Sequence, residues 1–128
     1  EEDYYGPLVI PCPFTEESEF GEFILFVQRQ SISMISLNSE RYSKDPIVPK
    51  TFLSNAIAAD FDLKNRSIYW SDISSNKIMR LRLDGVQVQP EILVESELYS
   101  VEGIAFNPVN RHLYFVNGFK SKASCFIL

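Results

Sequence analysis

Residues 65–72 read NRSIYWSD, and residues 110–117 read NRHLYFVN, a second version of the same pattern 45 residues later. Each block follows an Ile-Ala pair, at Ile57 and at Ile104, and these two pairs are 47 residues apart. Because the two offsets differ, we expect the turn between the pair and the block to be shorter by two residues in the second copy.

A partial third copy lies upstream of these two. Residues 24–26 (ILF) precede residues 68–70 by 44 positions, and residues 32–38 (ISMISLN) precede residues 78–84 by 46 positions. Self-similarity at about 40–47 residues, built from short apolar segments, is typical of the blades of a β-propeller. Helical repeats of that length would place apolar residues three and four apart, a spacing that this sequence lacks.

The first two segments of each repeat differ in character. Residues 56–61 and 103–106 are rich in small side chains, which fit near the crowded axis of a propeller. Residues 68–70 and 113–115 are continuous apolar runs, which suit a strand that is buried on both faces between neighbouring blades.

The later segments complete the blade. Residues 78–83 mix apolar and basic side chains and end at Asp84-Gly85, which signals a tight hairpin turn because glycine accepts a positive φ. Residues 91–94 then supply the outer strand. The sequence therefore predicts an all-β fold, a partial six-bladed β-propeller with about two and a half blades of four-stranded antiparallel sheet. Its ten strands are expected in groups of three, four and three.

Composition and charge exclude several classes of protein. The chain has 128 residues with a net charge of −5, so a basic surface for nucleic acid is not expected. No apolar run approaches the roughly 20 residues of a membrane-spanning helix. Residues 1–22 hold seven acids and no base, with Pro7, Pro11 and Pro13. We interpret residues 1–22 as an acidic leader or linker, and residues 23–128 as the propeller blades of an incomplete ring.

The stretch Tyr69–Asp72 resembles the signature of the YWTD propellers of the low-density lipoprotein receptor family. Five further segments are similar to that family in matching order, namely Phe23–Phe26, Ile57–Asp60, Ile78–Arg80, Leu83–Gly85 and Glu102–Ala105. The resemblance covers about residues 23–118, and it implies structural roles for Asp60, Tyr69, Trp70, Asp72, Arg80, Asp84 and Gly85. The third copy departs from it, because Asn107 replaces the inner-strand aspartate and Val116-Asn117 replaces Ser-Asp. The hydrogen bonds that those polar side chains would make between strands are therefore in doubt in that blade.

The resemblance also bears on the cysteines and on the cellular location. In that family the propeller follows an epidermal-growth-factor-like module, so Cys12 is either the last cysteine of such a module or a free thiol. Cys125 is expected as a small buried residue in a strand, and a Cys12–Cys125 bridge stays open. The resemblance implies an extracellular or cell-surface ectodomain, and Asn65 begins a glycosylation sequon.

The sequence offers little catalytic chemistry. His112 is the only histidine and is expected to be an exposed bystander. No Cys/His cluster has the spacing of a metal site, and we expect neither a metal nor another cofactor. Asp60 and Asp62 are interpreted as a cap on backbone amides and the start of a turn.

Loops that enter the inner strands, and those that follow the second strands, should gather at one end of a propeller. We therefore predict a ligand-binding surface with candidate residues Asn55, Asp72, Asn76, Glu102 and Asn117. The function predicted is a non-catalytic extracellular binding module, a fragment of a low-density lipoprotein receptor-related receptor whose partners are protein ligands or adjacent receptor modules. Self-association through open blade faces is a further expectation.

Two alternatives stay open. One is a fragment of a lactonase-like six-bladed hydrolase, in which Asn55, Glu102 and Asn117 would hold a metal. The other is a nidogen-like matrix adaptor.

Overall fold

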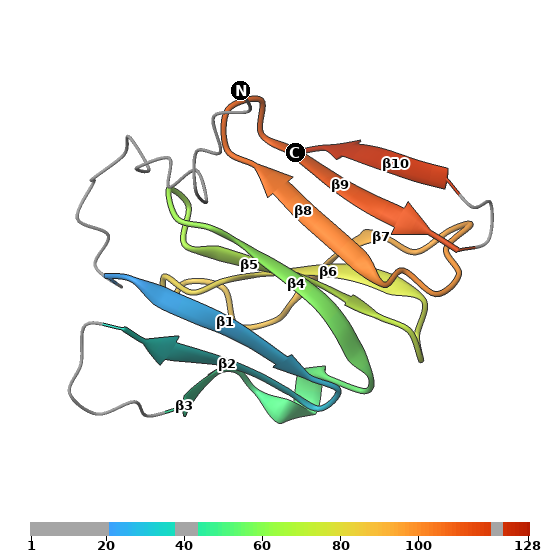
Figure 1. Cartoon of the computed structure of the whole chain (residues 1–128). Coiled ribbons are helices and arrows are strands. Elements are labelled where there is room, and N and C mark those ends of the chain that lie inside the picture. Colours follow the sequence, from blue (N-terminus) through green and yellow to red (C-terminus); the bar gives the residue numbers. More distant parts are fainter. Residues whose placement is uncertain (1–20, 38–43, 119–121) are drawn as a thin grey trace, which may run out of the picture.

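The computed structural model describes residues 21–37, 44–118 and 122–128, and over these ranges the chain forms ten β-strands in three antiparallel sheets. The first sheet has the order β1-β2-β3, the middle sheet β4-β5-β6-β7, and the third β8-β9-β10 (Figure 1). This grouping confirms the predicted partial propeller. The bounds are β1 (Phe23–Gln28), β2 (Ser31–Ser36), β3 (Lys44–Val48), a 3-10 turn η1 (Lys50–Phe52), β4 (Ala56–Asp62), β5 (Ser67–Asp72), β6 (Lys77–Arg82), β7 (Glu91–Val94), β8 (Gly103–Asn107), β9 (His112–Asn117) and β10 (Lys122–Ile127).

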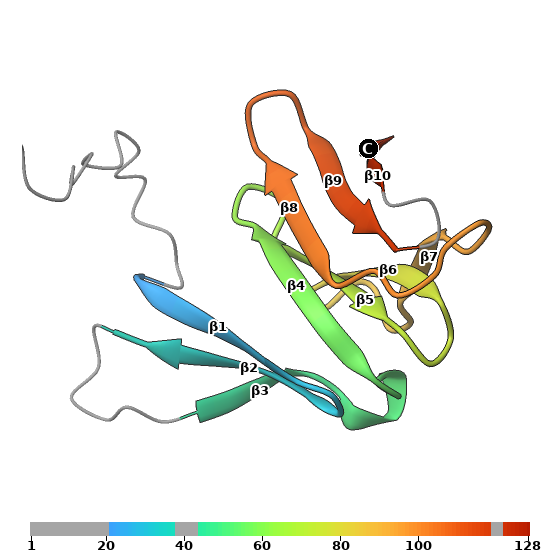
Figure 2. The same ribbon diagram turned by 45° about the vertical axis from the view of Figure 1, so that its right-hand side comes forward.

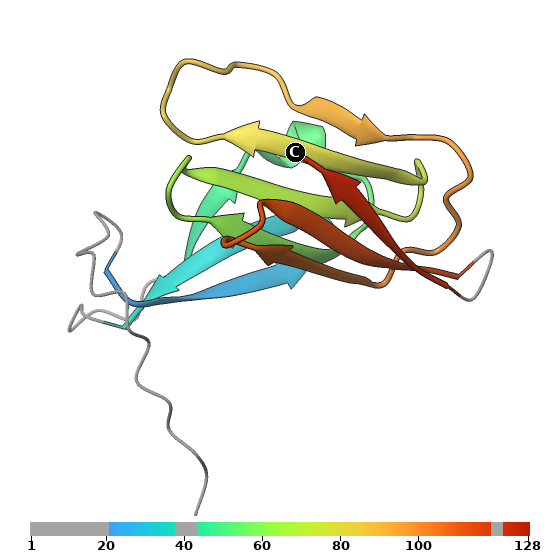
Figure 3. The ribbon, with the colours of Figure 1, turned by 90° about the horizontal axis from the view of Figure 1, so that it is seen from above.

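The three sheets follow one another with the middle sheet between the other two (Figures 1 and 2). Strand β4 contacts both β1 and β8, so the first strands of the three sheets lie next to one another. Viewed from above, β7 forms the edge of the middle sheet farthest from β4 (Figure 3). Most of the leader and Cys12 lie outside the described residues.

Strand β5 is buried along its whole length, as the continuous apolar run predicts. Its side chains alternate between two cores. Trp70 is 0% exposed and packs with Ile68 and Ile32 toward the first sheet, whereas Tyr69 packs toward Phe106 of the third sheet. Since burying one large apolar side chain contributes about 1.5–3 kcal/mol, this strand stabilises both interfaces.

Polar side chains of β4 reach the third sheet. Asp60 Oδ1 accepts the Phe61 N–H at 2.8 Å, and its Oδ2 accepts the Phe106 N–H at 2.7 Å. Asp62 accepts the Asn65 N–H at 3.3 Å at the start of the following turn. At the outer edge, Arg80 Nε donates to Glu91 Oε2 at 3.1 Å and joins β6 to β7.

The prediction of a shorter turn in the second copy is wrong. Residues 63–66 and 108–111 are turns of equal length, and each ends on an arginine with positive φ, 48° at Arg66 and 62° at Arg111. The offsets differ because the two Ile-Ala pairs do not take equivalent places in their strands: Ile104 pairs with Phe115 as Ala59, not Ile57, pairs with Trp70. Asn107 therefore occupies the place of Asp62, because it pairs with His112 as Asp62 pairs with Ser67.

Two further expectations need correction. Strand β6 ends at Arg82 and β7 begins at Glu91, so Asp84-Gly85 does not form a two-residue hairpin. It opens a longer loop, in which Gly85 has φ 79° and Asp84 Oδ1 accepts the Val86 N–H at 3.0 Å. Cys125 is exposed rather than buried, because it lies opposite Tyr114 on the face of the third sheet that points away from the middle sheet.

Candidate ligand-binding loops

The loops at one end of the three sheets are joined by main-chain and hydroxyl hydrogen bonds. The Ala56 N–H donates to the Arg29 carbonyl at 2.7 Å, and the Ile73 N–H donates to the Asn55 carbonyl at 3.1 Å. The Ser71 hydroxyl donates to the Val101 carbonyl at 2.7 Å. The loops that were expected to gather at one end do so, and the β1–β2 turn lies with them.

Asp72, the last residue of β5, holds this end of the middle sheet together. Its Oδ2 accepts the N–H groups of Ser54 and Asn55, both at 2.9 Å, and its Oδ1 accepts those of Ser74 and Ser75 at 3.0 and 3.1 Å. Burial alone would raise the pKa of this carboxyl, but the four N–H donors outweigh burial and hold the pKa below its usual value. Both oxygens are used internally, so the contacts favour the structural role of Asp72, and its ligand-binding role stays a prediction.

Asn117 ends β9 and occupies the corresponding place in the third sheet. Its Oδ1 accepts the Tyr99 N–H at 3.0 Å, and its Nδ2 donates to the Glu97 carbonyl at 2.6 Å. An amide thus performs the loop-holding task of the Asp72 carboxylate. One of the hydrogen bonds that the sequence left in doubt in this blade is therefore present. Val116 has no hydroxyl with which to repeat the bond that Ser71 makes.

Gln28 ends β1 and is the counterpart of these two residues in the first sheet. Its side chain is exposed and accepts a hydrogen bond from Lys44 Nζ instead of holding a loop. The sequence did not lead us to predict that the β1–β2 turn, which follows Gln28, belongs to this group of loops. The offset of 44 residues that aligns residues 24–26 with residues 68–70 also aligns Gln28 with Asp72, and it could have identified the position.

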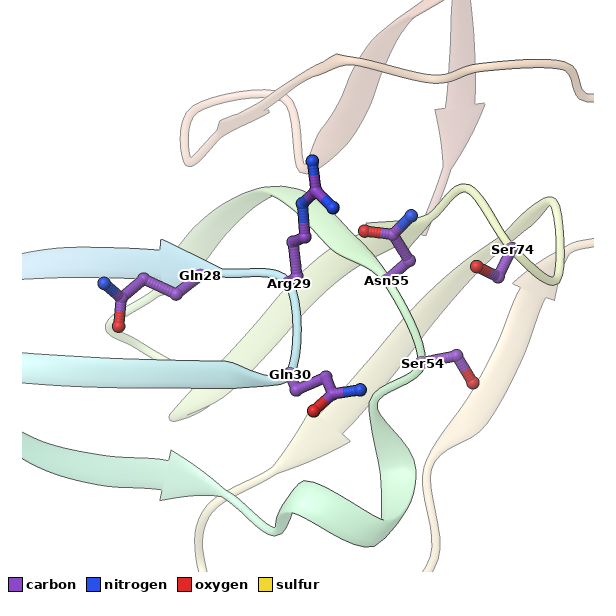
Figure 4. A pocket seen from close by; sticks show the side chains of 6 residues that line it. All are labelled: Gln28, Arg29, Gln30, Ser54, Asn55 and Ser74. Carbon is purple, nitrogen blue, oxygen red and sulfur yellow. The ribbon is translucent and has the colours of Figure 1, made fainter.

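A shallow recess of about 570 Å³ lies between the β1–β2 turn and the loops of the middle sheet (Figure 4). Its charged lining residue is Arg29, whose side chain extends to the same side as that of Asn55. The Asn55 Oδ1 atom is buried and has no hydrogen-bond partner among the described residues. The recess is lined by Gln28, Arg29, Gln30, Ser54, Asn55 and Ser74.

The other predicted site residues lie outside this recess. Glu102 directly precedes β8, as Asn55 directly precedes β4, and its exposed side chain accepts the Ser100 hydroxyl at 2.8 Å. Asn76 ends the β5–β6 turn with φ 50°. Of the five predicted residues, only Asn55 lines the recess.

Neither a metal-binding cluster nor a membrane-spanning helix is found in the part of the chain that the structure describes. Within it, no cluster of three or more His, Cys, Asp or Glu side chains could hold a metal ion, and His112 is half-buried with its ring 6.1 Å from that of Tyr114. No helix in the same residues has the length and apolar character needed to cross a membrane.

Comparison with known proteins finds related sequences in large receptors and in a nidogen. The chain is 41% identical over 94 residues to the sortilin-related receptor of Oryctolagus cuniculus, covering 73% of this chain and 4% of that protein. It is 33% identical over 101 residues to nidogen-2 of Mus musculus (76% and 7%). It is 34% identical over 86 residues to low-density lipoprotein receptor-related protein 4 of Homo sapiens (67% and 4%). The chain thus spans less than a tenth of the length of each of these relatives.

A solved structure supports the fold. A chain of the crystal structure of a nidogen/laminin complex superimposes with a TM-score of 0.69 at 23% identity, over 82% of this chain and 40% of that chain. No family model matches the sequence.

Proposed function

Since the chain belongs to the YWTD-repeat β-propellers of the low-density lipoprotein receptor family, we propose that it works as part of an extracellular, non-catalytic module that binds a protein ligand. Its relatives include receptors of this kind, among them low-density lipoprotein receptor-related protein 8 of Homo sapiens, at 30% identity over 96 residues. The proposed binding surface comprises the loop end with Asn55, Asn76 and Glu102, together with Arg29.

The observation that carries this proposal is the fixed arrangement of the loops. Asp72 and Asn117 hold the loops of two successive sheets through backbone hydrogen bonds. Binding groups are commonly carried by loops on a rigid scaffold, and preorganised loops lose less entropy when a ligand binds. A surface of this kind suits recognition of another protein.

The arrangement is less suited to the hydrolase alternative. A metal held by Asn55, Glu102 and Asn117 would need all three side chains to converge, but the Asn117 amide is engaged by Tyr99 and Glu97. Asn55 also shares its recess with Arg29, whose positive charge repels a divalent cation. A nidogen-like adaptor would use the same loops for a protein partner, so one experiment addresses both kinds of binding protein.

The experiment measures binding of the full chain, immobilised through its C-terminus, to a panel of purified secreted proteins and receptor ectodomains. We expect a ligand whose affinity falls at least tenfold in the double variant Asn55→Ala/Glu102→Ala. The matched control is Lys64→Ala, which changes an exposed residue in the β4–β5 turn at the opposite end of the strands. Equal binding by the wild type, the double variant and the Lys64→Ala control would contradict the proposal. So would metal-dependent lactone hydrolysis by the wild type that is lost in Glu102→Ala.

A further inference from the structure

We propose that the recess beside the β1–β2 turn is a subsite for an acidic side chain, Asp or Glu, on an extended peptide segment of the ligand. The inference rests on the proposed function, and it names the chemistry of the segment that this surface accepts. It is carried by two features of the recess, namely a guanidinium without a partner among the described residues and a buried acceptor that is likewise unpartnered.

The recess lies where the β1–β2 turn of the first sheet meets the loop before β4 of the middle sheet. Asp72 and Asn117 each hold the loop that precedes the first strand of their own sheet. Gln28, at the corresponding end of β1, interacts with Lys44 on β3. The hydrogen bond from the Ala56 N–H to the Arg29 carbonyl joins this turn to the middle sheet, and the recess opens beside it.

Arg29 supplies the charge. Its backbone is fixed, because its carbonyl accepts the Ala56 N–H at 2.7 Å, but its exposed guanidinium makes no hydrogen bond or ion pair to any described residue. All other lining residues are neutral, so no carboxylate of the lining competes for this cation. A guanidinium presents its N–H groups as a planar fork that matches a carboxylate, which favours Asp or Glu over a neutral side chain.

Asn55 supplies the second contact. Its buried Oδ1 accepts no hydrogen bond from the described residues, and a buried acceptor without a donor is costly. A peptide N–H is the donor that an incoming segment always carries. An acidic residue of a peptide therefore offers both missing groups, a carboxylate for Arg29 and a backbone N–H for Asn55. The volume of about 570 Å³ lies within the usual range for small ligand sites.

The test uses the ¹⁵N-labelled full chain and a minimal probe, N-acetyl-aspartate N-methylamide, titrated by NMR. We expect saturable shifts of the Arg29 Nε–H and Asn55 Nδ2 signals at millimolar probe. The Arg29→Gln variant should bind the probe at least tenfold more weakly, and the Arg29→Glu variant should not bind it. The matched control Arg82→Gln, a half-exposed arginine paired with Asp84, should bind like the wild type. The amide spectrum of each variant reports whether it is folded.

Three comparisons make the result decisive. The corresponding asparagine probe should bind at least tenfold more weakly, and equal binding would overturn the charge assignment. Sodium acetate should bind more weakly than the aspartate probe, because it lacks the N–H for Asn55; equal binding would reduce the site to an anion site and overturn the peptide assignment. If the protein ligand loses affinity in Asn55→Ala/Glu102→Ala but not in Arg29→Gln, the subsite is wrong and the proposed function stands. If none of these variants weakens the ligand, the proposed function fails.

Discussion

Arg111 and Asp62 form a two-point ion pair between the third and the middle sheet. Arg111 Nη1 donates to Asp62 Oδ1 at 3.1 Å, and Nη2 donates to Oδ2 of the same carboxylate. Asp62 is 1% exposed, and the guanidinium also lies over the Phe106 ring, 5.0 Å from its centroid. The hydrogen bonds to Asp62 raise the pKa of Arg111 above its ordinary value. The turn of one blade is thereby fixed on the inner strand of the preceding blade.

We expect Arg111→Gln to lower the free energy of unfolding by about 2–3 kcal/mol, because the buried Asp62 carboxylate loses its countercharge. Urea denaturation measures this loss. The matched variant Arg82→Gln removes a half-exposed arginine that pairs with Asp84 at 2.8 Å, and it should cost under about 1 kcal/mol. Equal losses in the two variants would show that the Arg111–Asp62 pair has no special stabilising role.

This ion pair also illustrates the limit of sequence reasoning. Repeat spacing was sufficient to predict ten strands and the burial of Trp70, because alternation and apolar runs are local properties of the chain. It did not predict that Arg111 meets Asp62, because the two are 49 residues apart and the contact depends on how neighbouring sheets pack. The spacing gave a length difference between copies, but it could not show that the two Ile-Ala pairs lie at different places in their strands. The strand register resolves that ambiguity, because Ala59 and not Ile57 corresponds to Ile104.

The candidate site was predicted in part for the same reason. The order of strands in a blade places loops such as those at Asn55 and Glu102 at one end, and the structure has them there. Whether a polar side chain in such a loop points to a ligand or to its own backbone depends on distances that a sequence does not carry. Asp72 and Asn117 bind backbone groups, whereas Arg29, which was not predicted, lines the recess.

Asp72 should make stability depend on acid pH. Its pKa is lower in the folded chain than in the unfolded chain, so its stabilising contribution is complete above the unfolded value near 3.8. That contribution is lost as the pH falls from there through the folded pKa. Asp72→Asn should therefore cost about 1–2 kcal/mol at pH 7 and less at pH 3. Denaturation midpoints between pH 3 and pH 7 measure the difference between variant and wild type, and a constant difference would contradict the assignment.

Trp70 is the single tryptophan, so its fluorescence reports on the core between the first and middle sheets. Because the ring is fully buried, we expect emission shifted to short wavelength, weak quenching by acrylamide, and a shift to longer wavelength on unfolding. Trp70→Ala should destabilise the chain by about 3–5 kcal/mol through the cavity that it leaves. Trp70→Phe should cost less, since it also removes an Nε1 that has no acceptor among the described residues. A native spectrum like that of a solvated indole would contradict this packing.

Asn65 is the predicted glycan acceptor. It is exposed in the β4–β5 turn, at the opposite end of the strands from the proposed binding loops, so a glycan there would leave these loops accessible. Expression through the mammalian secretory pathway should give a product whose mass falls on treatment with an N-glycosidase, and Asn65→Gln should abolish that change. Asn65→Gln is a cleaner variant than Ser67→Ala, because Ser67 is 2% exposed and donates to the Asn65 carbonyl at 3.2 Å. An unmodified wild-type product would contradict the prediction.

The 128-residue chain should self-associate through the face of the third sheet that points away from the middle sheet. Tyr114, Val116 and Ile127 lie there at 38%, 55% and 71% exposure, and exposed apolar sheet faces recruit partners. Val116→Lys/Ile127→Lys should therefore shift sedimentation toward the monomer without changing the Trp70 fluorescence. The matched double variant Val86→Lys/Val88→Lys changes two exposed valines in the loop between β6 and β7, outside any sheet, and should associate like the wild type. A monomeric wild type at tens of micromolar, or equal dissociation by both double variants, would count against association through this face.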